Sequence, residues 1–126
     1  MATSVDSRAA KVPRLINEAD AAEFTVVLTD DGVAASAGGS LMDVGAAGTW
    51  YAAVWDDVDA ASSGVAPLFE TTITVPAEGT VHGVEAAADV KAAGDGTYWW
   101  ALVRLSPRQT FYAGPYTIAA GWAGDA

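Results

Sequence analysis

The most strand-like segment of this chain reads Thr97-Tyr98-Trp99-Trp100-Ala101-Leu102-Val103-Arg104-Leu105. Aromatic, branched and other apolar residues dominate it, and such residues fit the pleated, half-buried surface of a β-sheet. A second segment of the same kind reads Thr49-Trp50-Tyr51-Ala52-Ala53-Val54-Trp55. We expect both segments to be strands of one β-rich domain.

Shorter segments on either side alternate apolar and polar residues, as half-buried strands do. Residues 22–29 and 68–75 are the clearest of them, and turns rich in glycine, proline and aspartate separate the segments. About seven such strands at close spacing, with no long amphipathic helix between them, predict an all-β antiparallel sandwich. The residues expected in its core are Phe24, Val26, Leu28, Phe69, Ile73, Tyr98, Trp100 and Ile118.

The first 21 residues lack this alternation. Residues 12–16 form an extended piece, because a proline at position 13 disfavours helix in the residue before it. We expect residues 1–21 to be an extended N-terminal arm and residues 22–122 to be the sandwich domain, with a single helical turn at Ala86–Ala93. The apolar cluster of the arm is expected to dock on a different polypeptide. Its members are Val12, Pro13, Leu15 and Ile16.

The charge balance narrows the classes of partner. The chain has 6 basic and 16 acidic residues, which gives a net charge of −10 at pH 7. A field of this sign repels phosphate backbones and anionic lipids, so we expect neither nucleic-acid nor membrane binding. The absence of cysteine excludes disulfides and thiolate chemistry. The first residues lack the basic flank and apolar block of a signal peptide, so we expect synthesis in the cytoplasm without secretion by that route.

Residue types that carry chemistry give no recognisable catalytic pattern. His82 is the only histidine, and metal or triad chemistry needs partners that the sequence does not identify. The aspartates of residues 56–59 could supply calcium ligands, but their spacing differs from that of an EF-hand, and a solvated acidic loop explains them better. We predict no catalytic residue, no metal site and no cofactor, and therefore expect a protein that is not an enzyme.

Aromatic residues occupy both faces of the two strongest strands, whereas a sandwich buries only one face of each sheet. Some of these rings should therefore point outward, where they either stack on a sugar or are buried by another subunit. We favour a subunit, since the chain is poor in the amide side chains that usually flank a sugar platform. The predicted assembly interface consists of Val12, Pro13, Leu15, Ile16, Tyr51, Trp55 and Trp99.

The run Gly94-Asp95-Gly96-Thr97-Tyr98-Trp99-Trp100 resembles the tyrosine corner of immunoglobulin-like sandwiches. In that motif the tyrosine opens a strand and its hydroxyl bonds to the backbone a few residues upstream. Trp100 stands where an antibody domain carries its second cysteine. The aspartate lies one position later than the motif has it. The resemblance implies an immunoglobulin-like sandwich.

From Phe24 to Ala120 the order of strands, turns and aromatic runs looks like that of the small immunoglobulin-like accessory domains of tailed viruses. These are similar to the N-terminal domains of baseplate upper proteins. The residues that carry over are Gly96, Tyr98, Trp100 and Gly114, and they are residues of the fold. The resemblance implies a virion structural protein, in a tail, baseplate, fibre or capsid-surface decoration, whose partners are other virion proteins and copies of itself. The alternative is a carbohydrate-binding module or adhesin domain that binds a host-surface glycan.

Overall fold

A computed structural model describes residues 10–17, 20–105 and 108–119. The N-terminal strands are β2 (Ala10–Lys11), β3 (Arg14–Asn17) and β4 (Ala22–Val27), and the middle strands are β5 (Trp50–Trp55), β6 (Phe69–Glu70) and β7 (Thr72–Thr74). The C-terminal strands are β8 (Thr80–Glu85), β9 (Gly96–Leu105) and β10 (Arg108–Ala119). The helices are α1 (Val58–Ser62) and α2 (Ala87–Ala93), with short 3-10 turns at Ala35–Ala37 and Ala47–Thr49.

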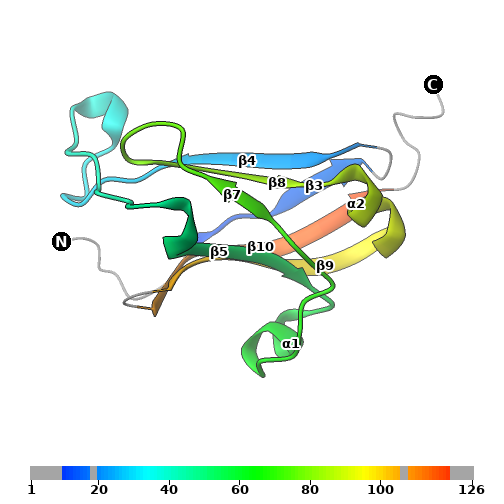
Figure 1. Cartoon of the computed structure of the whole chain (residues 1–126). Helices are drawn as coiled ribbons and strands as arrows, with labels where there is room; N and C mark the ends of the chain where they lie inside the picture. The colour runs from blue at the N-terminus through cyan, green and yellow to red at the C-terminus, as the bar shows by residue number, and fades with distance from the viewer. Residues whose placement is uncertain (1–9, 18–19, 106–107, 120–126) are drawn as a thin grey trace.

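Two sheets pack face to face (Figure 1). The large sheet has the order β2-β10-β9-β5-β6, with β3 also paired to β10, and the small sheet has the order β4-β8-β7. All pairs are antiparallel except those of β2 and β3 with β10, which are parallel. The prediction of an all-β domain is confirmed, and the parallel edge of the large sheet is a departure from the antiparallel pairing we predicted.

The core lies between the sheets and contains the predicted residues. Leu28, Phe69, Trp100 and Ile118 are buried in one apolar cluster. The other four are partly buried and pack against that cluster: Phe24, Val26, Ile73 and Tyr98. None of the eight is exposed, so the predicted core is confirmed. The single strand predicted at residues 68–75 is wrong, because the segment crosses between the sheets and forms β6 in one and β7 in the other.

The described part of the predicted arm, residues 10–17, is an edge strand of the same chain. The amide of Val12 donates to the carbonyl of Ala113 at 2.9 Å, and the Val12 carbonyl accepts from Nε1 of Trp100 at 2.8 Å. Gly114 permits this approach, because a Cβ there would clash with the Val12 carbonyl. The backbone of residues 10–17 thus pairs with its own chain, which corrects the prediction of a free arm, while docking of the exposed Pro13 and Leu15 on a different polypeptide stays a prediction. Residues 1–9 and the predicted domain end at residue 122 lie outside the described residues.

The turns around the two helices follow the sequence in part. The helical turn predicted at Ala86–Ala93 forms as α2, and the hydroxyl of Tyr98 donates to the carbonyls of Ala93 and Gly94 at 2.7 and 3.0 Å. The upstream backbone bond expected of this tyrosine is thus present. The acidic loop predicted at residues 56–59 differs, because α1 begins within it, with its N-terminus capped by the carboxylate of Asp57.

Candidate functional site

The residues that the sequence analysis considered for catalysis or metal binding lie apart from one another. His82 is on the outer side of the small sheet, where its Nδ1 lies 2.8 Å from the Thr25 hydroxyl and its Nε2 lies 3.4 Å from a Glu23 oxygen. The loop aspartates are engaged locally: backbone amides of Ser40 and Val33 donate to Asp31 and lower the pKa of its carboxyl. Among the described residues, no three acidic, histidine or cysteine side chains are grouped so as to hold a metal ion.

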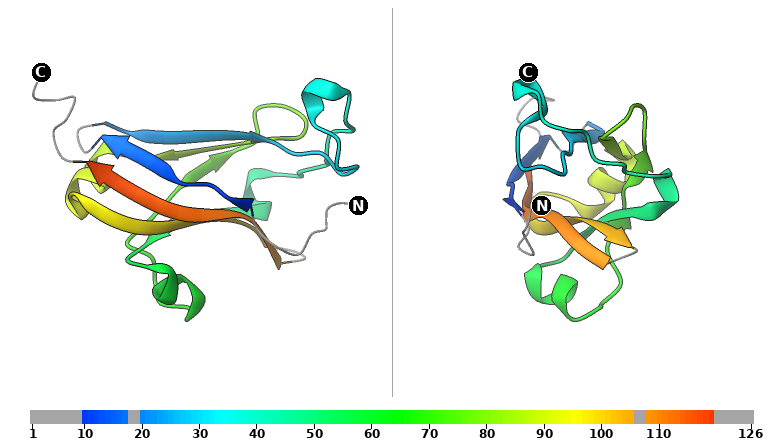
Figure 2. Two further views of the ribbon diagram at one scale, coloured as in Figure 1. Left: turned by 180° about the vertical axis from the view of Figure 1, so that it is seen from behind. Right: turned by 90° about the vertical axis from the view of Figure 1, so that its left-hand side faces the viewer.

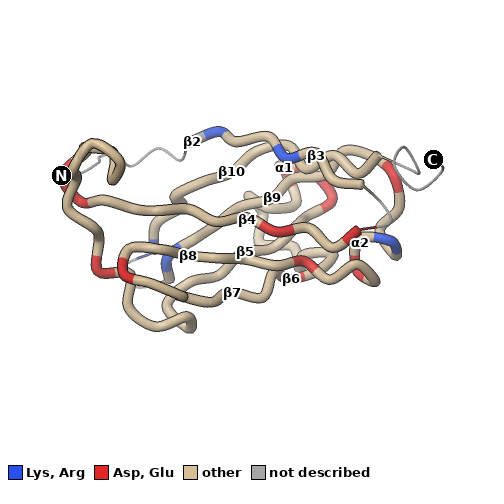
Figure 3. Tube along the Cα trace, turned by 90° about the horizontal axis from the view of Figure 1, so that it is seen from above, with Lys and Arg blue, Asp and Glu red and all other residues tan. Residues whose placement is uncertain are grey.

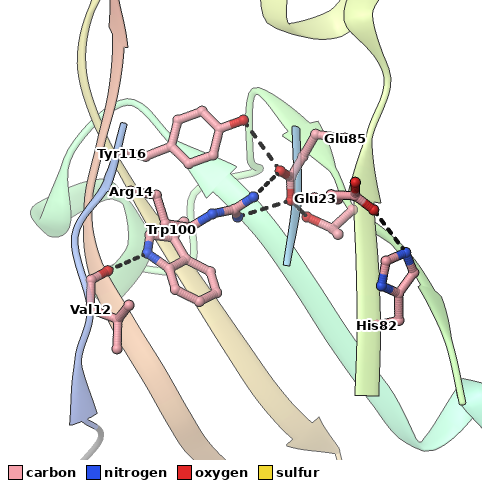
Figure 4. A network of polar contacts seen from close by, with 8 residues as sticks. Val12, Arg14, Glu23, His82, Glu85, Trp100 and Tyr116 are labelled. Carbon is pink, nitrogen blue, oxygen red and sulfur yellow. Dashed lines mark hydrogen bonds and ion pairs between the residues drawn. The ribbon is translucent and has the colours of Figure 1, made fainter. Parts of the chain in front are cut away.

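A buried polar cluster joins the two sheets, and the sequence did not reveal it (Figure 4). Arg14 of β3 donates to both oxygens of Glu85 on β8, at 2.6 and 3.2 Å. The Tyr116 hydroxyl donates to the same carboxylate at 3.3 Å, and the Thr71 hydroxyl does so as well. Burial, then the negative charge of Glu85, raise the pKa of Tyr116 well above its ordinary value.

Three aromatic rings enclose the guanidinium of Arg14. Its Cζ lies 5.1 Å from the ring centre of Phe24, 4.8 Å from that of Trp100 and 4.9 Å from that of Tyr116. Cation–π contacts of this kind stabilise a desolvated cation. The side chains of Arg14 and Glu85 are 7% and 0% exposed, so the cluster is closed to ligands. Its role is to hold β3 and the large sheet against the small sheet.

A different surface is open to partners: the outer face, which we define as the side of the large sheet turned away from the small sheet. Side chains alternate along a strand, so the neighbours of core residues point to this side. The core positions Trp100 and Tyr116 thus place Trp99 and Pro115 on the outer face, where the two are paired across β9 and β10. The outer-face residues of the three central strands are Tyr51, Ala53, Trp55, Thr97, Trp99, Ala101, Val103, Leu105, Arg108, Thr110, Ala113, Pro115, Thr117 and Ala119.

Among these central outer-face residues only Arg108, at the start of β10, is charged, although the chain as a whole carries 22 charged residues. The other charges lie in loops and on other strands or strand faces, including that of Glu23 on β4 (Figure 3). A sheet face with so little charge is ordinarily buried against something, because exposed apolar patches of this kind mark interaction surfaces. The outer face therefore needs a cover, and the structure shows what part of that cover is.

The segment that carries α1 covers one half of the outer face, over β5 and β9 (Figures 1 and 2). Ala53, Trp55, Ala101 and Val103 form a second buried cluster there, with Ala60 and Ala61 packed against it. Nε1 of Trp55 donates to the carbonyl of Val65 at 2.9 Å. We call these four buried residues and α1 the covered half.

The rest of the outer face, over β10 and the edge strands, has no such cover within the described chain. Leu15 is 66% exposed beside Thr117, Pro13 is exposed, and Trp99 is half-buried. Thr97 and Thr117 face each other with hydroxyl oxygens 3.4 Å apart. We call this part, with Pro115 and the exposed Lys11 of β2, the open half.

The structure divides the predicted interface residues into three groups. Pro13, Leu15 and Trp99 lie on the open half, while Tyr51 is half-buried at the edge of the covered half. Trp55 is only 8% exposed, so the expectation that another subunit buries it is wrong: its own chain does so. Val12 and Ile16 point inward and pack against the main core, which corrects their place in the interface.

Tyr51 lies at the edge of the covered half, next to β6. Its ring packs edge-on against Trp55, with ring centres 6.3 Å apart, and its hydroxyl donates to Glu70 at 3.3 Å. Partial burial, followed by the neighbouring Glu70 carboxylate, raises the pKa of this tyrosine. Glu70 is exposed, so a carboxylate marks the β6 edge of the outer face.

A shallow groove lies elsewhere, beside α2. It is lined by Asp56, Leu68, Asp89 and Tyr98, among others. The Tyr98 hydroxyl is already bonded to the backbone, which leaves two carboxylates as its polar groups. We assign no chemistry to this groove.

Comparison with models of protein families, with curated protein sequences and with solved structures finds no match to this chain. Neither α-helix in the described part of the chain has the length and apolar character needed to span a membrane. The function must therefore be argued from the surfaces themselves.

Proposed function

We propose that this chain is a non-enzymatic structural protein of a tailed-virus particle, which assembles with other virion proteins through the open half of its outer face. The observation that carries the assembly role is a largely apolar sheet face, with Arg108 as the one charge on its three central strands, on a chain of net charge −10. Exposing Leu15 and part of Trp99 to water is unfavourable, and a protein partner that covers them removes this cost.

We further infer that the sandwich is immunoglobulin-like, which is the basis of the viral part of the proposal. Three features support it: the pairing of β4, β8 and β7 in one sheet, the order β10-β9-β5 in the other, and the Tyr98 hydroxyl bonded to the backbone before its strand. The resemblance to tailed-virus accessory domains extends this to a tail, baseplate, fibre or capsid-surface component. That step is an analogy at the level of the fold.

Carbohydrate binding is the second candidate, because Trp99 presents part of its ring on the open half. Its outer-face neighbours across the sheet are Trp55 and Pro115, neither of which offers a side-chain hydrogen bond to a sugar there: the Trp55 indole is already bonded to Val65. Sugar sites combine an aromatic platform with placed polar groups. The hydroxyls that the open half does offer, those of Thr97 and Thr117, lie 3.4 Å from each other. We therefore favour a protein partner.

The test is incorporation of the tagged full chain into particles of the virus that encodes it. We expect Leu15→Glu to lose incorporation, because it places a charge on the open half. The matched control is Val27→Glu, which changes a similarly exposed strand residue (48% exposed) on the outer side of the small sheet. Absence of the wild-type chain from particles, or equal incorporation of both variants, would overturn the proposal. So would a glycan that quenches tryptophan fluorescence of the wild type but not of Trp99→Phe.

A further inference from the structure

The outer face has a step. The covered half is raised by α1 and its flanking loops, which stand on the sheet over β5 and β9 (Figure 2). The open half is low, because Ala113, Pro115 and Thr117 are its central residues and have short or compact side chains. One face thus carries both a ridge and a floor beside it.

The two sides of the step differ in charge. The ridge carries the exposed Asp57 and Asp59 of the α1 segment, and the β6 edge behind it carries Glu70. The far edge of the floor carries Lys11, which is exposed and paired with Ala113 in the register of the sheet. No ion pair of Lys11 is present among the described residues.

The strand register places residues of opposite charge at the two ends of one row across the large sheet. Lys11, Ala113, Ala101, Ala53 and Glu70 are successive partners across the five strands of the large sheet. The row therefore begins with a cation, continues through three alanines and ends with a carboxylate. When two such rows face each other and run in opposite directions, the cation of each row lies opposite the carboxylate of the other.

We propose that the outer face binds a second copy of this chain in a two-fold dimer. This rests on the proposed function, which makes the outer face a docking surface, and it names the partner. A two-fold axis parallel to the strands, above the step, sets the ridge of each copy on the floor of the other. The aspartates of each ridge then approach Lys11 of the opposite copy. The Leu15 and Trp99 side chains of both copies are covered by the interface.

A second copy fits this surface better than a basic partner does. An isologous interface requires that one patch carry complementary features on both sides of its axis. Ridge against floor and aspartate against lysine satisfy that requirement, whereas a uniformly basic partner would meet Lys11 with like charge. The outer-face residues of the central strands include no carboxylate, so the two copies bring no carboxylate against a carboxylate there.

Net charge sets the salt dependence of this dimer. Two copies of charge −10 repel each other over a distance that shrinks with salt, from about 30 Å at 0.01 M to about 8 Å at 0.15 M. The apolar contact is insensitive to this screening. We therefore expect the dimer to be stronger at about 150 mM salt than at about 10 mM.

The experiment is sedimentation equilibrium of the full chain. Wild type should dimerise, and Lys11→Glu should weaken the dimer by about tenfold or more, because symmetry repeats the reversed pair twice. Lys91→Glu is the matched control: it makes the same charge change at an exposed lysine of α2, away from the outer face, and should leave the dimer unchanged. Circular dichroism checks that each variant is folded.

A mixing test identifies the pair. Asp59→Lys alone should also weaken the dimer, since its new lysine would face Lys11. An equimolar mixture of Lys11→Glu and Asp59→Lys should form a heterodimer, because both pairs across the axis are then attractive. A mixture that stays monomeric, a Lys11→Glu variant that matches Lys91→Glu, or a wild-type chain that is monomeric at all salt concentrations overturns the dimer.

The two proposals fail separately. A chain that is monomeric but whose Leu15→Glu variant is still lost from virus particles has a different partner on the same face; the dimer is then wrong and the assembly role stands. A chain that dimerises in solution but is absent from particles keeps the dimer and loses the viral role.

Discussion

The outer sides of the two sheets arise from the same alternation of side chains but differ in composition. On the small sheet, the outer residues of β4, β8 and β7 are mostly polar, such as Glu23, Thr25, His82 and Thr74, with Val27 and Val84 as the apolar ones. On the large sheet, the outer residues of β5, β9 and β10 are mostly aromatic, aliphatic or alanine, with threonines and Arg108 as the polar ones. The small sheet therefore needs little cover on its outer side, whereas the large sheet has two faces to cover.

This difference gives one connection a second role. The segment between β5 and β6 does more than link two strands, because it folds back as α1 and buries Trp55. Its helix contacts β5 and β9. What remains is the open half, and the same argument that explains α1 predicts that something covers this half too.

The largest expected effect comes from the interior, where the two sheets are joined. Arg14→Met should lower the free energy of unfolding by about 3–5 kcal/mol, because it leaves the Glu85 carboxylate buried without its cation. Urea unfolding followed by tryptophan fluorescence measures this. The double variant Arg14→Met/Glu85→Leu removes both charges and should recover at least half of the loss. A double variant as unstable as the single one would show that Arg14 acts by packing on its three rings instead.

A smaller effect should distinguish the two outer sides directly. Trp55→Ala should cost about 3 kcal/mol, since the ring is buried beneath α1 and its loss leaves a cavity. Thr25→Ala, on the exposed side of the small sheet, should change stability by about 0.5 kcal/mol or less. Urea unfolding of both variants provides the comparison. Equal costs would mean that the covered half is no more a core than the face of the small sheet.

The fold could be predicted from the sequence in the segments where apolar and polar residues alternate. Phe24 and Ile73 were placed inside because their neighbours are polar, and the structure agrees. The edge strand β3 was missed because Pro13 and the charged Arg14 interrupt the pattern. Arg14 is in fact a core residue, but only a partner 71 positions away, Glu85, makes that possible.

The candidate site could be predicted only in part, because it too depends on contacts between residues far apart in the sequence. Aromatic residues on both sides of β5 and β9 predicted a second covered surface, but not what covers it. Trp55 is buried by its own chain because α1 forms, and α1 depends on the Asp57 cap within a segment of only five helical residues. The charge asymmetry of the outer face depends on strand register, which places Lys11 and Glu70 in one row. Local sequence does not contain that pairing.

The smallest expected effect is on the polar side of the small sheet. Glu23 is the acidic partner of His82 there, but its side chain is 70% exposed and the ion pair is 3.4 Å long. Exposed pairs of this kind contribute little, because water solvates both charges and ordering the side chains costs entropy. Glu23→Gln should therefore change the free energy of unfolding by about 0.5 kcal/mol or less.

The measurement is urea unfolding in mildly acidic and in mildly alkaline buffer, because only a protonated imidazole forms an ion pair with a carboxylate. His82→Gln in the same two buffers completes the comparison, and a double variant isolates the pairwise contribution. A coupling above about 1 kcal/mol in acidic buffer would mean that this face is organised around the pair. The polar outer side of the small sheet would then contribute to stability. The two sheets would differ only in how much apolar surface their outer sides carry.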